Sequence, residues 1–318
     1  MPMFELDDQP RVSVVTPTFN YGKYCGDVIA SVMSQTYSRI EHIVVDDGSY
    51  DDTPEILAGL VARWAPKLVV MRQRNSGQAV AVNRGLLAAT GDVVLWINSD
   101  DLLAPSAVED GVRALHEHPE AAAVYGDWVR VDSGGHLQAV MRPGKVTIDQ
   151  LFLGGLTIAN CALFIRRAVL HDIGLLDPAL QCTLDWDFVV RIALRHQIAY
   201  SSGRPWAYYR DHPTTKTHSR RIVAAREYHY TYEKALTRPD LPKSVLRVRR
   251  LARSRARWLS AVCYAFGGAP VQAGIQAFFS FLLDPIAFLA RRQFEPHPRI
   301  VGVGHELRRR LAAARAQA

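Results

Sequence analysis

The stretch VVLWINSDD, residues 93–101, decides how this sequence is interpreted. Its apolar run predicts a buried strand, and the strand ends in a carboxylate pair with no basic residue beside it. Asp100 and Asp101 repel each other, so the pair is easiest to keep when a divalent cation carrying an anionic ligand lies between them. The alternative is that both residues cap a helix that begins near Pro105.

The charge of the chain is unevenly distributed. Residues 1–217 contain 19 Lys and Arg against 25 Asp and Glu, a net −6, whereas residues 218–318 contain 19 against 6, a net +13. The pI of 9.3 is therefore a property of the C-terminal third. With 318 residues, of which 48% are hydrophobic, the chain is long enough for one large or two ordinary globular domains.

Cysteine usage and the N-terminal sequence bear on the compartment. The four cysteines show no CxxC spacing, so there is no zinc motif, and the pattern is typical of reduced thiols in a cytosolic protein. The sequence MPMFELDDQPR lacks the basic start and apolar core of a signal peptide, and no run of about twenty apolar residues follows. We therefore expect a cytoplasmic protein, with the inner face of the plasma membrane as its one candidate for membrane contact.

Strand-like and helical stretches alternate through the first hundred residues, which is typical of a parallel sheet covered by helices. The expected strands are 12–16, 40–45, 68–71 and 93–97, and the expected helices are 23–35, 54–64 and 78–89. Further strands are expected at 122–125, 128–132 and 137–141, the last two joined by a hairpin turn at SGGH, residues 133–136. After residue 220 only helices are expected, at roughly 220–236, 243–265, 269–291 and 304–317.

Three of the expected strands end in polar turns: PTFN at 17–20, DDGS at 46–49 and NSDD at 98–101. Because ligands bind outside the carboxyl ends of the strands in open α/β sheets, these turns should meet. The DDGS turn offers acceptors for a base or ribose and a glycine that lets the backbone approach a ligand, although an ordinary strand-to-helix turn has the same composition. A fourth turn, NSG at 75–77, suits a ribose or phosphate at the N-terminus of the helix after it.

These residues resemble the family 2 glycosyltransferases, whose nucleotide-sugar domain has the GT-A fold. The resemblance covers about residues 10–217. It rests on the order and spacing of eight pieces: VSVVTPTFN at 12–20, HIVVDDGSYDDT at 42–53, NSGQAVAVNRG at 75–85, GDVVLWINSDDLLAP at 91–105, VYGDWVRVDSGG at 124–135, CALFIRRAVLHDIGLLD at 161–177, LDWDFVVRI at 184–192 and YYRDHPTTKT at 208–217.

The resemblance implies an α/β fold with a Rossmann-like mixed sheet and helices on both faces. Residues 1–217 would form the catalytic nucleotide-sugar domain, and residues 218–318 a basic, amphipathic helical appendage. The implied activity is inverting transfer of a sugar from a nucleotide diphosphate donor, preferably a UDP-sugar, to a glycan or lipid-linked acceptor in cell-surface polysaccharide synthesis.

Two other functions fit parts of the sequence. A sugar-1-phosphate nucleotidylyltransferase would need a glycine-rich triphosphate loop near the first strand, and PTFNYGKY offers a single glycine. A catalytically inactive scaffold of a glycan-assembly pathway, binding nucleotide or membrane, is supported by the two departures from the family pattern, Asn98 and Leu184. Nucleotide binding without turnover on any donor would favour the scaffold.

The resemblance and the polar turns together give a set of donor-binding residues. In this set Asp46 or Asp47 binds the base, and Arg84 either lies near the phosphates or pairs with an acid. The full set is Pro17, Thr18, Asn20, Asp46, Asp47, Gly77, Arg84, Asn98, Ser99, Asp101, Trp186 and Lys216.

A divalent cation, Mn²⁺ or Mg²⁺, is the implied cofactor, because NSD at 98–100 occupies the place of the family's DxD. Here the first carboxylate is Asn98, whose amide oxygen carries no charge, so Asp100 is the expected direct ligand and metal affinity should be lower. Asp101 is instead a candidate to bind the sugar. His212 is a second candidate ligand, or it closes over the diphosphate together with Lys216; a surface turn is the alternative for both.

Inverting transfer needs a base that takes the proton of the acceptor hydroxyl. Asp185 matches the Asp of the family's ED motif, although Leu184 replaces the usual Glu. Trp186 is either a wall for a sugar ring or a core residue. Asp187 and Arg191, four residues apart on the expected helix, are interpreted as a structural ion pair.

The basic tail combines apolar and cationic helical faces. In 243–265 an apolar face lies opposite an arginine-rich one, and residues 271–289 carry a wide apolar stripe broken at Asp284-Pro285. Such helices could lie on an anionic membrane surface, or pack on one another or in a homodimer. We expect no nucleic acid partner, because no aromatic stacking platform accompanies the arginines.

Overall fold

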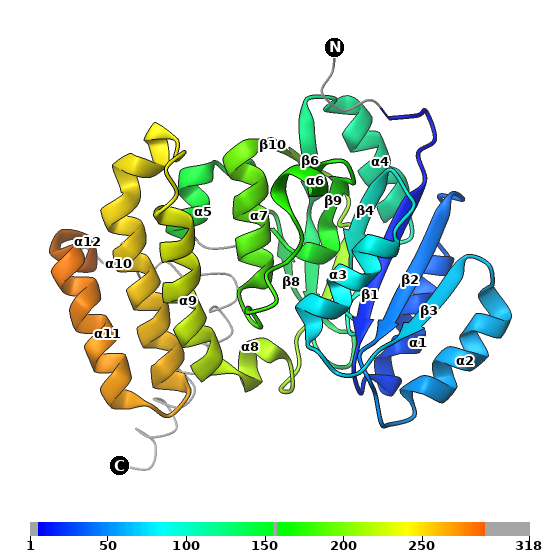
Figure 1. The fold of residues 1–318 in the computed structure, drawn as a ribbon, viewed down its shortest axis with the longest axis horizontal. Helices are drawn as coiled ribbons and strands as arrows, with labels where there is room; N and C mark the ends of the chain where they lie inside the picture. Colours follow the sequence, from blue (N-terminus) through cyan, green and yellow to red (C-terminus); the bar gives the residue numbers. More distant parts are fainter. Residues whose placement is uncertain (1–5, 155–157, 290–318) are drawn as a thin grey trace. The chain divides into compact units, whose positions relative to one another are not determined.

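The apolar runs of the first two hundred residues form a seven-stranded sheet with the strand order β10-β6-β9-β4-β1-β2-β3 (Figure 1). The computed structural model describes residues 6–154 and 158–289, without the side chains of 217 and 218. The chain divides into two units. The first, residues 1–146 with 158–213, contains the sheet, and the second consists of residues 147–157 with 214–318. That these units are separate domains stays a prediction.

The central sheet is mixed. Strands β1 (Val12–Thr18), β2 (Ile40–Asp46), β3 (Leu68–Arg72) and β4 (Val93–Trp96) pair in parallel, as do β6 (Ala121–Gly126) and β10 (Gln197–Ser201). Strand β9 (Leu163–Arg166) is antiparallel to both of its neighbours, β4 and β6. The register places Thr18 opposite Asp46, and Asp46 opposite Arg72, so the carboxyl ends of β1, β2 and β3 are level.

A second, four-stranded sheet has the order β5-β11-β7-β8. It contains the expected hairpin, β7 (Trp128–Val131) with β8 (Leu137–Met141), and two strands that the sequence did not predict, β5 (Leu102–Leu103) and β11 (Ala207–Arg210). Strands β9 and β10 were missed in the same way. These four strands are short and lack the alternation that separates a strand from a loop in sequence.

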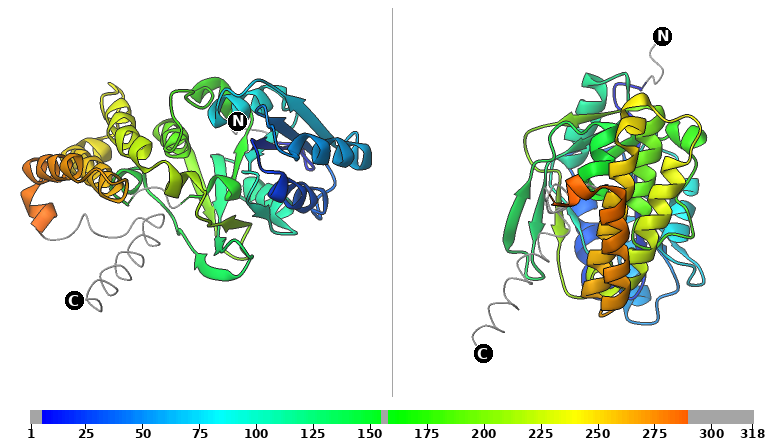
Figure 2. Two further views of the ribbon diagram at one scale, coloured as in Figure 1. Left: turned by 90° about the horizontal axis from the view of Figure 1, so that it is seen from below. Right: turned by 90° about the vertical axis from the view of Figure 1, so that its left-hand side faces the viewer.

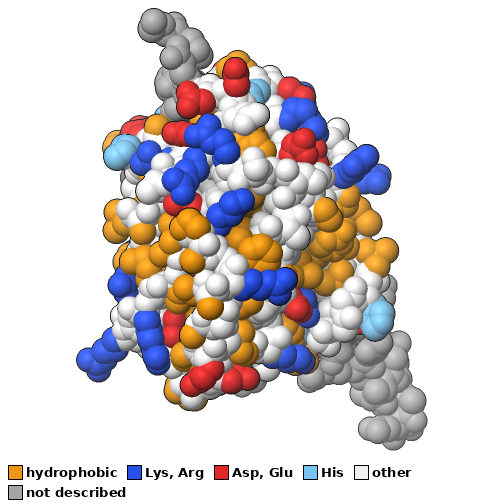
Figure 3. Space-filling view, turned by 90° about the vertical axis from the view of Figure 1, so that its right-hand side faces the viewer, with side chains coloured by type: hydrophobic (Ala, Val, Ile, Leu, Met, Phe, Trp, Pro, Cys, Tyr) orange, Lys and Arg blue, Asp and Glu red, His pale blue; other side chains and the backbone are white. Residues whose placement is uncertain are grey.

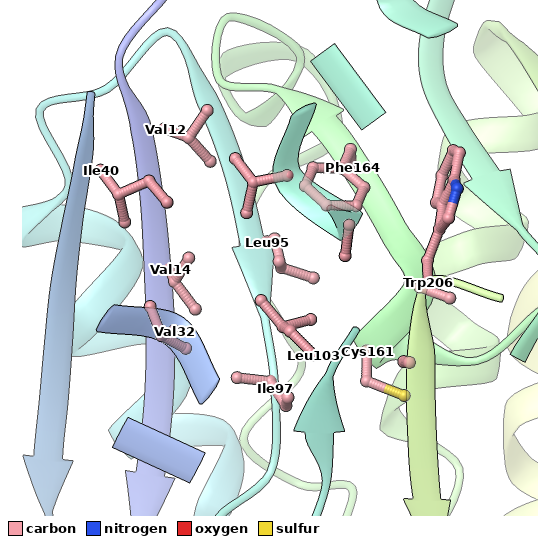
Figure 4. Packing of buried hydrophobic residues seen from close by; sticks show 14 of the residues in the cluster. Val12, Val14, Val32, Ile40, Leu95, Ile97, Leu103, Cys161, Phe164 and Trp206 are labelled. Atoms are coloured by element: carbon pink, nitrogen blue, oxygen red, sulfur yellow. The ribbon is translucent and has the colours of Figure 1, made fainter. Parts of the chain in front are cut away.

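Helices cover both faces of the central sheet. Helices α1 (Gly22–Met33), α2 (Thr53–Trp64) and α4 (Ala107–Glu117) share one hydrophobic core with alternate residues of the strands, including Val12, Val14, Leu95 and Ile97 (Figure 4). On the other face, α3 (Gln78–Ala88) packs Gly85 against Val15, and α7 (Leu184–Arg195) packs Phe188 on Trp96. A short helix, α6 (Val169–Ile173), precedes α7.

The surface of the face drawn in Figure 3 carries acidic and basic side chains interspersed among apolar ones. Interspersed charge of both signs favours no single charged partner over this face.

The second unit is helical. It consists of α5 (Ile148–Gly154), α8 (Lys216–Ser219), α9 (Arg221–Leu236), α10 (Lys243–Phe266), α11 (Pro270–Leu283) and α12 (Pro285–Leu289). The long helices α9, α10 and α11 lie side by side (Figure 2). The helical stretch expected at 269–291 is divided at Asp284-Pro285, the break expected from the sequence, because Pro285 cannot continue the hydrogen-bond ladder of α11. The helix expected at 304–317 lies outside the described residues.

The core of the sheet contains a buried histidine. His42 on β2 is fully buried, and its Nε2 lies 2.8 Å from Thr16 Oγ1, while its Nδ1 has no hydrogen-bond partner in the described part of the chain. Burial lowers the pKa of His42 from 6.5 to about 3, because the charged imidazolium would lose its hydration. The folded state therefore keeps this imidazole neutral at pH values where the unfolded chain protonates it.

This difference between the folded and unfolded pKa of His42 makes the free energy of unfolding depend on pH. The stabilisation is complete above the unfolded pKa near 6.5 and is lost as the pH falls toward about 3, at about 1.4 kcal/mol per pH unit. His42→Gln should remove that loss, so between pH 7 and 4.5 the unfolding free energy of the wild type should fall by about 2 kcal/mol more than that of the variant. Urea unfolding at both pH values measures this, and equal losses would show that the imidazole is protonated in the folded state.

Candidate active site

The polar turns after β1, β2 and β4 lie together at one edge of the sheet. The backbone N–H of Asp47 donates to the carbonyl of Thr18 at 2.8 Å, and the hydroxyl of Ser99 donates to the carbonyl of Pro17 at 2.6 Å. Asn20, at φ 56°, links the first two turns, because its N–H donates to Ser49 Oγ and its side-chain oxygen accepts from the N–H of Tyr50. The edge is therefore tied together by its own hydrogen bonds.

Asp47 anchors the NSG turn. Its Oδ1 accepts from Gln73 Nε2 and from the N–H of Ser76, both at 2.8 Å, and its Oδ2 accepts from the N–H of Gly77 at 2.8 Å. Gly77 has φ 92°, a conformation that favours glycine, and directly precedes α3. Both oxygens of Asp47 are thus committed to the turn that begins this helix.

Asp46 is arranged differently from its neighbour. Its Oδ1 accepts from the N–H of Ser49 at 2.9 Å, whereas its Oδ2 makes no hydrogen bond in the described structure and lies 3.3 Å from Arg72 Nε. Arg72 also donates to the carbonyl of Ser49 at 2.7 Å. The hydroxyl of Thr18, opposite Asp46 in the register, is buried and likewise has no hydrogen-bond partner in this part of the chain. Two neighbouring strands therefore end in polar atoms without hydrogen bonds.

Asn98 is part of a chain of side chains. Its Oδ1 accepts from Gln78 Nε2 at 2.7 Å, and its Nδ2 donates to Asp101 Oδ2 at 3.1 Å. The other oxygen of Asp101 accepts from the N–H of Arg210 at 3.0 Å. Burial, and then the nearby carboxylate of Asp100, raise the pKa of Asp101 well above its ordinary value. The amide of Asn98 thus supports a buried carboxyl group without adding another negative charge.

Asp100 lies against His212, with Oδ2 and Nε2 3.0 Å apart and both side chains largely buried. The ring of Tyr24 stacks on His212 at 5.4 Å between centroids, and the Arg210 guanidinium lies 4.8 Å from the Tyr24 ring. Burial, and then the negative charges of Asp100 and Asp101, raise the pKa of Tyr21 beside this group. Ring stacking with Tyr24 and the contact with Asp100 fix the position of the His212 side chain.

The Asp100–His212 pair fits a divalent cation by its chemistry and its spacing. Two ligands at about 2.1 Å from one cation lie about 3.0 Å apart when their bonds meet at a right angle. In the described part of the chain, no group of three or more His, Cys, Asp or Glu side chains could hold a metal ion. The protein would therefore supply two ligands, and the remaining ones would come from a diphosphate and water.

The first turn of α7 carries the predicted base. Asp185 is 7% exposed, its Oδ1 accepts from the N–H of Trp186 at 2.8 Å, and the positive end of the helix dipole stabilises an anion there. Trp186 is 4% exposed. The interpretation of Asp187 and Arg191 as a structural pair agrees with their 2.9 Å ion pair; Arg191 also donates to the carbonyls of Ile173 and Leu175.

Arg84 and Lys216 complete the predicted set. Arg84 donates to the carbonyl of Arg72 at 2.8 Å and to Gln73, so it links α3 to the end of β3 rather than pairing with an acid there. Lys216 begins α8 in the second unit, so its approach to the diphosphate stays a prediction.

Sequence reasoning missed several residues of this edge, among them Arg72, Gln78 and Arg210. Arg72 ends the expected third strand, so the rule that linked the other turns could have found it.

Comparison with known proteins agrees with this architecture. The profile described as glycosyl transferase family 2 matches residues 13–174. An uncharacterized glycosyltransferase of Rickettsia bellii is 31% identical over 191 residues, which are 58% of this chain and 27% of that protein. A PGL/p-HBAD biosynthesis glycosyltransferase of Mycobacterium bovis is 30% identical over 183 residues, 57% of this chain and 69% of that protein. The chain thus spans only about a quarter of the Rickettsia relative.

Two solved structures share the fold. S. aureus TarS 1-349 in complex with UDP-GlcNAc superposes with a TM-score of 0.62 at 18% identity, covering 85% of this chain and 89% of that one. The mannosyltransferase PcManGT from Pyrobaculum calidifontis, in complex with GDP-Man and Mn2+, gives 0.59 at 21% identity, covering 92% and 85%. At such identities the likeness shows the fold alone, the expected GT-A fold. Because the family profile covers half of the sequence, the chain belongs to glycosyl transferase family 2.

Proposed function

We propose that this protein transfers a sugar from a UDP-sugar to a glycan or lipid-linked acceptor, with inversion, in the synthesis of a cell-surface polysaccharide. One observation supports this most. The same edge of the sheet carries both an Asp46 oxygen that makes no hydrogen bond and the Asp100–His212 pair. The first suits a base, and the second suits a cation on a diphosphate. The relatives add support, since one is named for PGL/p-HBAD biosynthesis, and two solved neighbours are complexes with UDP-GlcNAc and GDP-Man.

Base recognition falls to Asp46 and Arg72. A carboxylate accepts the N3–H of uracil, and a guanidinium beside it donates to the adjacent carbonyl. In adenine and cytosine the ring nitrogen at this edge is an acceptor and the exocyclic amine is the donor, so neither base has a ring N–H beside a carbonyl. Guanine presents the same pattern through N1–H and O6, so GDP is the competitor that a binding experiment has to include. Asp47 is not the base ligand in this proposal, because the NSG turn uses both of its oxygens.

Asp100 and His212 would hold the divalent cation, and a bound cation offsets the negative charge that develops on the leaving diphosphate. Asp185 takes the proton from the acceptor hydroxyl as the hydroxyl oxygen attacks the anomeric carbon. The bond from that carbon to the diphosphate breaks on the opposite side, which inverts the configuration. Asp101 positions Asp100 and the β11 backbone in this scheme, since both of its oxygens are occupied by Asn98 and Arg210.

Replacing the neutral residue of the acidic edge tests the charge balance. Asn98→Asp would bring a carboxylate against Asp101, because the two side chains are 3.1 Å apart. With a chelator at pH 8, the variant should lose about 1–3 kcal/mol of unfolding free energy, and Mn²⁺ should raise its melting temperature more than that of the wild type. Asn98→Ala removes the same hydrogen bonds without a charge and is the control. Equal Mn²⁺ responses of all three proteins would contradict the assignment of a cation site to this acidic edge.

Base recognition is tested by nucleotide affinity. Asp46→Asn keeps the shape of the side chain but removes its negative charge and replaces one acceptor oxygen by an NH₂ donor. The Kd for UDP should therefore rise about tenfold or more. Asp132→Asn, on the exposed hairpin, should leave the Kd unchanged. Calorimetry with UDP, GDP, ADP and CDP in the presence of Mn²⁺ measures both effects. Preference for ADP or CDP, or an unchanged Kd for UDP, would refute the role of Asp46.

The catalytic assignment is tested by turnover. Asp185→Asn should lower kcat about 10²–10⁴-fold while donor affinity stays the same, because the amide cannot accept the hydroxyl proton. Release of nucleoside diphosphate from a panel of nucleotide sugars, with and without candidate acceptors, gives both quantities. Wild-type turnover in the variant would remove Asp185 from the mechanism. Tight donor binding without turnover by the wild type on any donor and acceptor would favour the scaffold function.

A further inference from the structure

Helices α11 and α12 of the second unit expose a row of large apolar side chains. We call this row the α11 face; its members are 48–77% exposed. It consists of Val271, Ile275, Phe278, Leu282, Ile286 and Leu289. In α11 the members are spaced by three or four residues, so they lie on one side of the helix, and α12 continues the row.

The opposite side of α11 is used for packing inside the unit. Ser280 is fully buried and exchanges hydrogen bonds with Ser254 of α10, at 2.7 Å and 2.9 Å through the backbone carbonyls. Figure 2 shows α11 in the foreground of its right-hand view, lying along α10. No residue from 270 to 283 is charged. A surface helix normally turns its polar side outward, and this one turns an apolar side outward, which marks an interaction surface.

Cationic side chains border the α11 face. Arg257 of α10 lies 5.4 Å from the ring of Phe279 and donates to Gln276 at 2.9 Å. Arg250, two turns earlier, is 3.8 Å from Asp284 and its side chain is 70% exposed. Residues 214–289 carry 13 Lys and Arg against four Asp and Glu. The surroundings of the apolar row therefore have a strong positive charge.

We propose that the α11 face docks on an anionic lipid surface. The apolar side chains would enter the boundary between headgroups and acyl chains, while the arginines of α10 contact the headgroups. In the described part of the chain, no helix is long and apolar enough to cross a membrane, so α11 would lie in the surface.

Charge and size favour lipid over a second copy of this chain. Two copies meeting through this face would bring two positively charged units together, whereas an anionic surface attracts them. A stable protein interface takes roughly 20–30 residues from each side, and the α11 face offers six large side chains. Shallow insertion of a few apolar side chains, aided by charge, is sufficient on a membrane.

Vesicle sedimentation of the full chain tests this proposal. The protein should partition onto vesicles of phosphatidylcholine with phosphatidylglycerol, and only weakly onto phosphatidylcholine alone. Phe278→Ser with Leu282→Ser should lower the partition coefficient about tenfold or more. Leu87→Ser with Leu137→Ser, which removes two apolar side chains of at least the same exposure from the first unit, is the matched control and should have no effect. Arg250→Gln should lower binding about fivefold, and added salt should lower it further.

The folding of the variants is the control for the vesicle experiment. The mutated side chains are exposed, so circular dichroism and melting temperature should match the wild type; if they do not, Ile286→Ser with Leu289→Ser replaces the pair. Unchanged vesicle binding by the α11 variants, or no preference for anionic lipid by the wild type, overturns the proposal. A dimer in analytical ultracentrifugation that the variants abolish, without vesicle binding, assigns the face to a second copy. Donor turnover measured without lipid is a separate readout and should be the same in all variants.

Discussion

The parallel pairing of β1 with β2 on one side and β4 on the other is the constraint on which the rest of the first unit depends. Because β1 is buried along its whole length between two helical layers, its register cannot slip by one residue without turning its core side chains to the wrong face. The same register makes β1 and β2 end level, at Thr18 and Asp46, whereas β4 ends at Trp96, opposite Val15, and continues into the NSDD turn. Hydrophobic packing thereby sets where the polar turns meet, although none of the turn residues takes part in the core.

Bringing these turns together collects carboxylates at one edge, and each needs its own compensation. Backbone N–H groups donate to Asp47, a guanidinium lies beside Asp46, a side-chain amide donates to Asp101, and an imidazole lies against Asp100. A guanidinium and an imidazole can also contact a bound anion or cation, so the proposed function assigns ligand binding to Asp46 and Asp100 and a supporting role to Asp47 and Asp101.

The sequence predicted the long strands and helices and the polar edge of the sheet. It did not predict features that depend on residues distant in the sequence. Long apolar runs such as β1 and β4 carry enough pattern to be assigned, whereas the two residues of β5 form a strand only because β11 pairs with them. In the same way, the sequence DDGS does not indicate which of the two aspartates has an oxygen without a hydrogen bond. That follows from Gln73 and Ser76, which reach Asp47 from the end of the next strand. The position of Asn98 at the place of the family's DxD was visible in the sequence, but its hydrogen bond to Asp101 was not.

The second unit shows the same limit in its amphipathic helices. Periodicity predicted an arginine-rich face on α10 and an apolar stripe on α11. It did not indicate which of the two would be used for packing inside the unit and which would be exposed. In the structure Arg253 forms a bidentate pair with Glu233 of α9, and Arg257 bonds Gln276 of α11, so part of the arginine face holds the helices together. The apolar stripe of α11 has the opposite outcome, because buried Ser280 takes the inward position and the large side chains remain outside. A burial pattern opposite to the usual one is costly in water, so it points to a different environment for this side of α11.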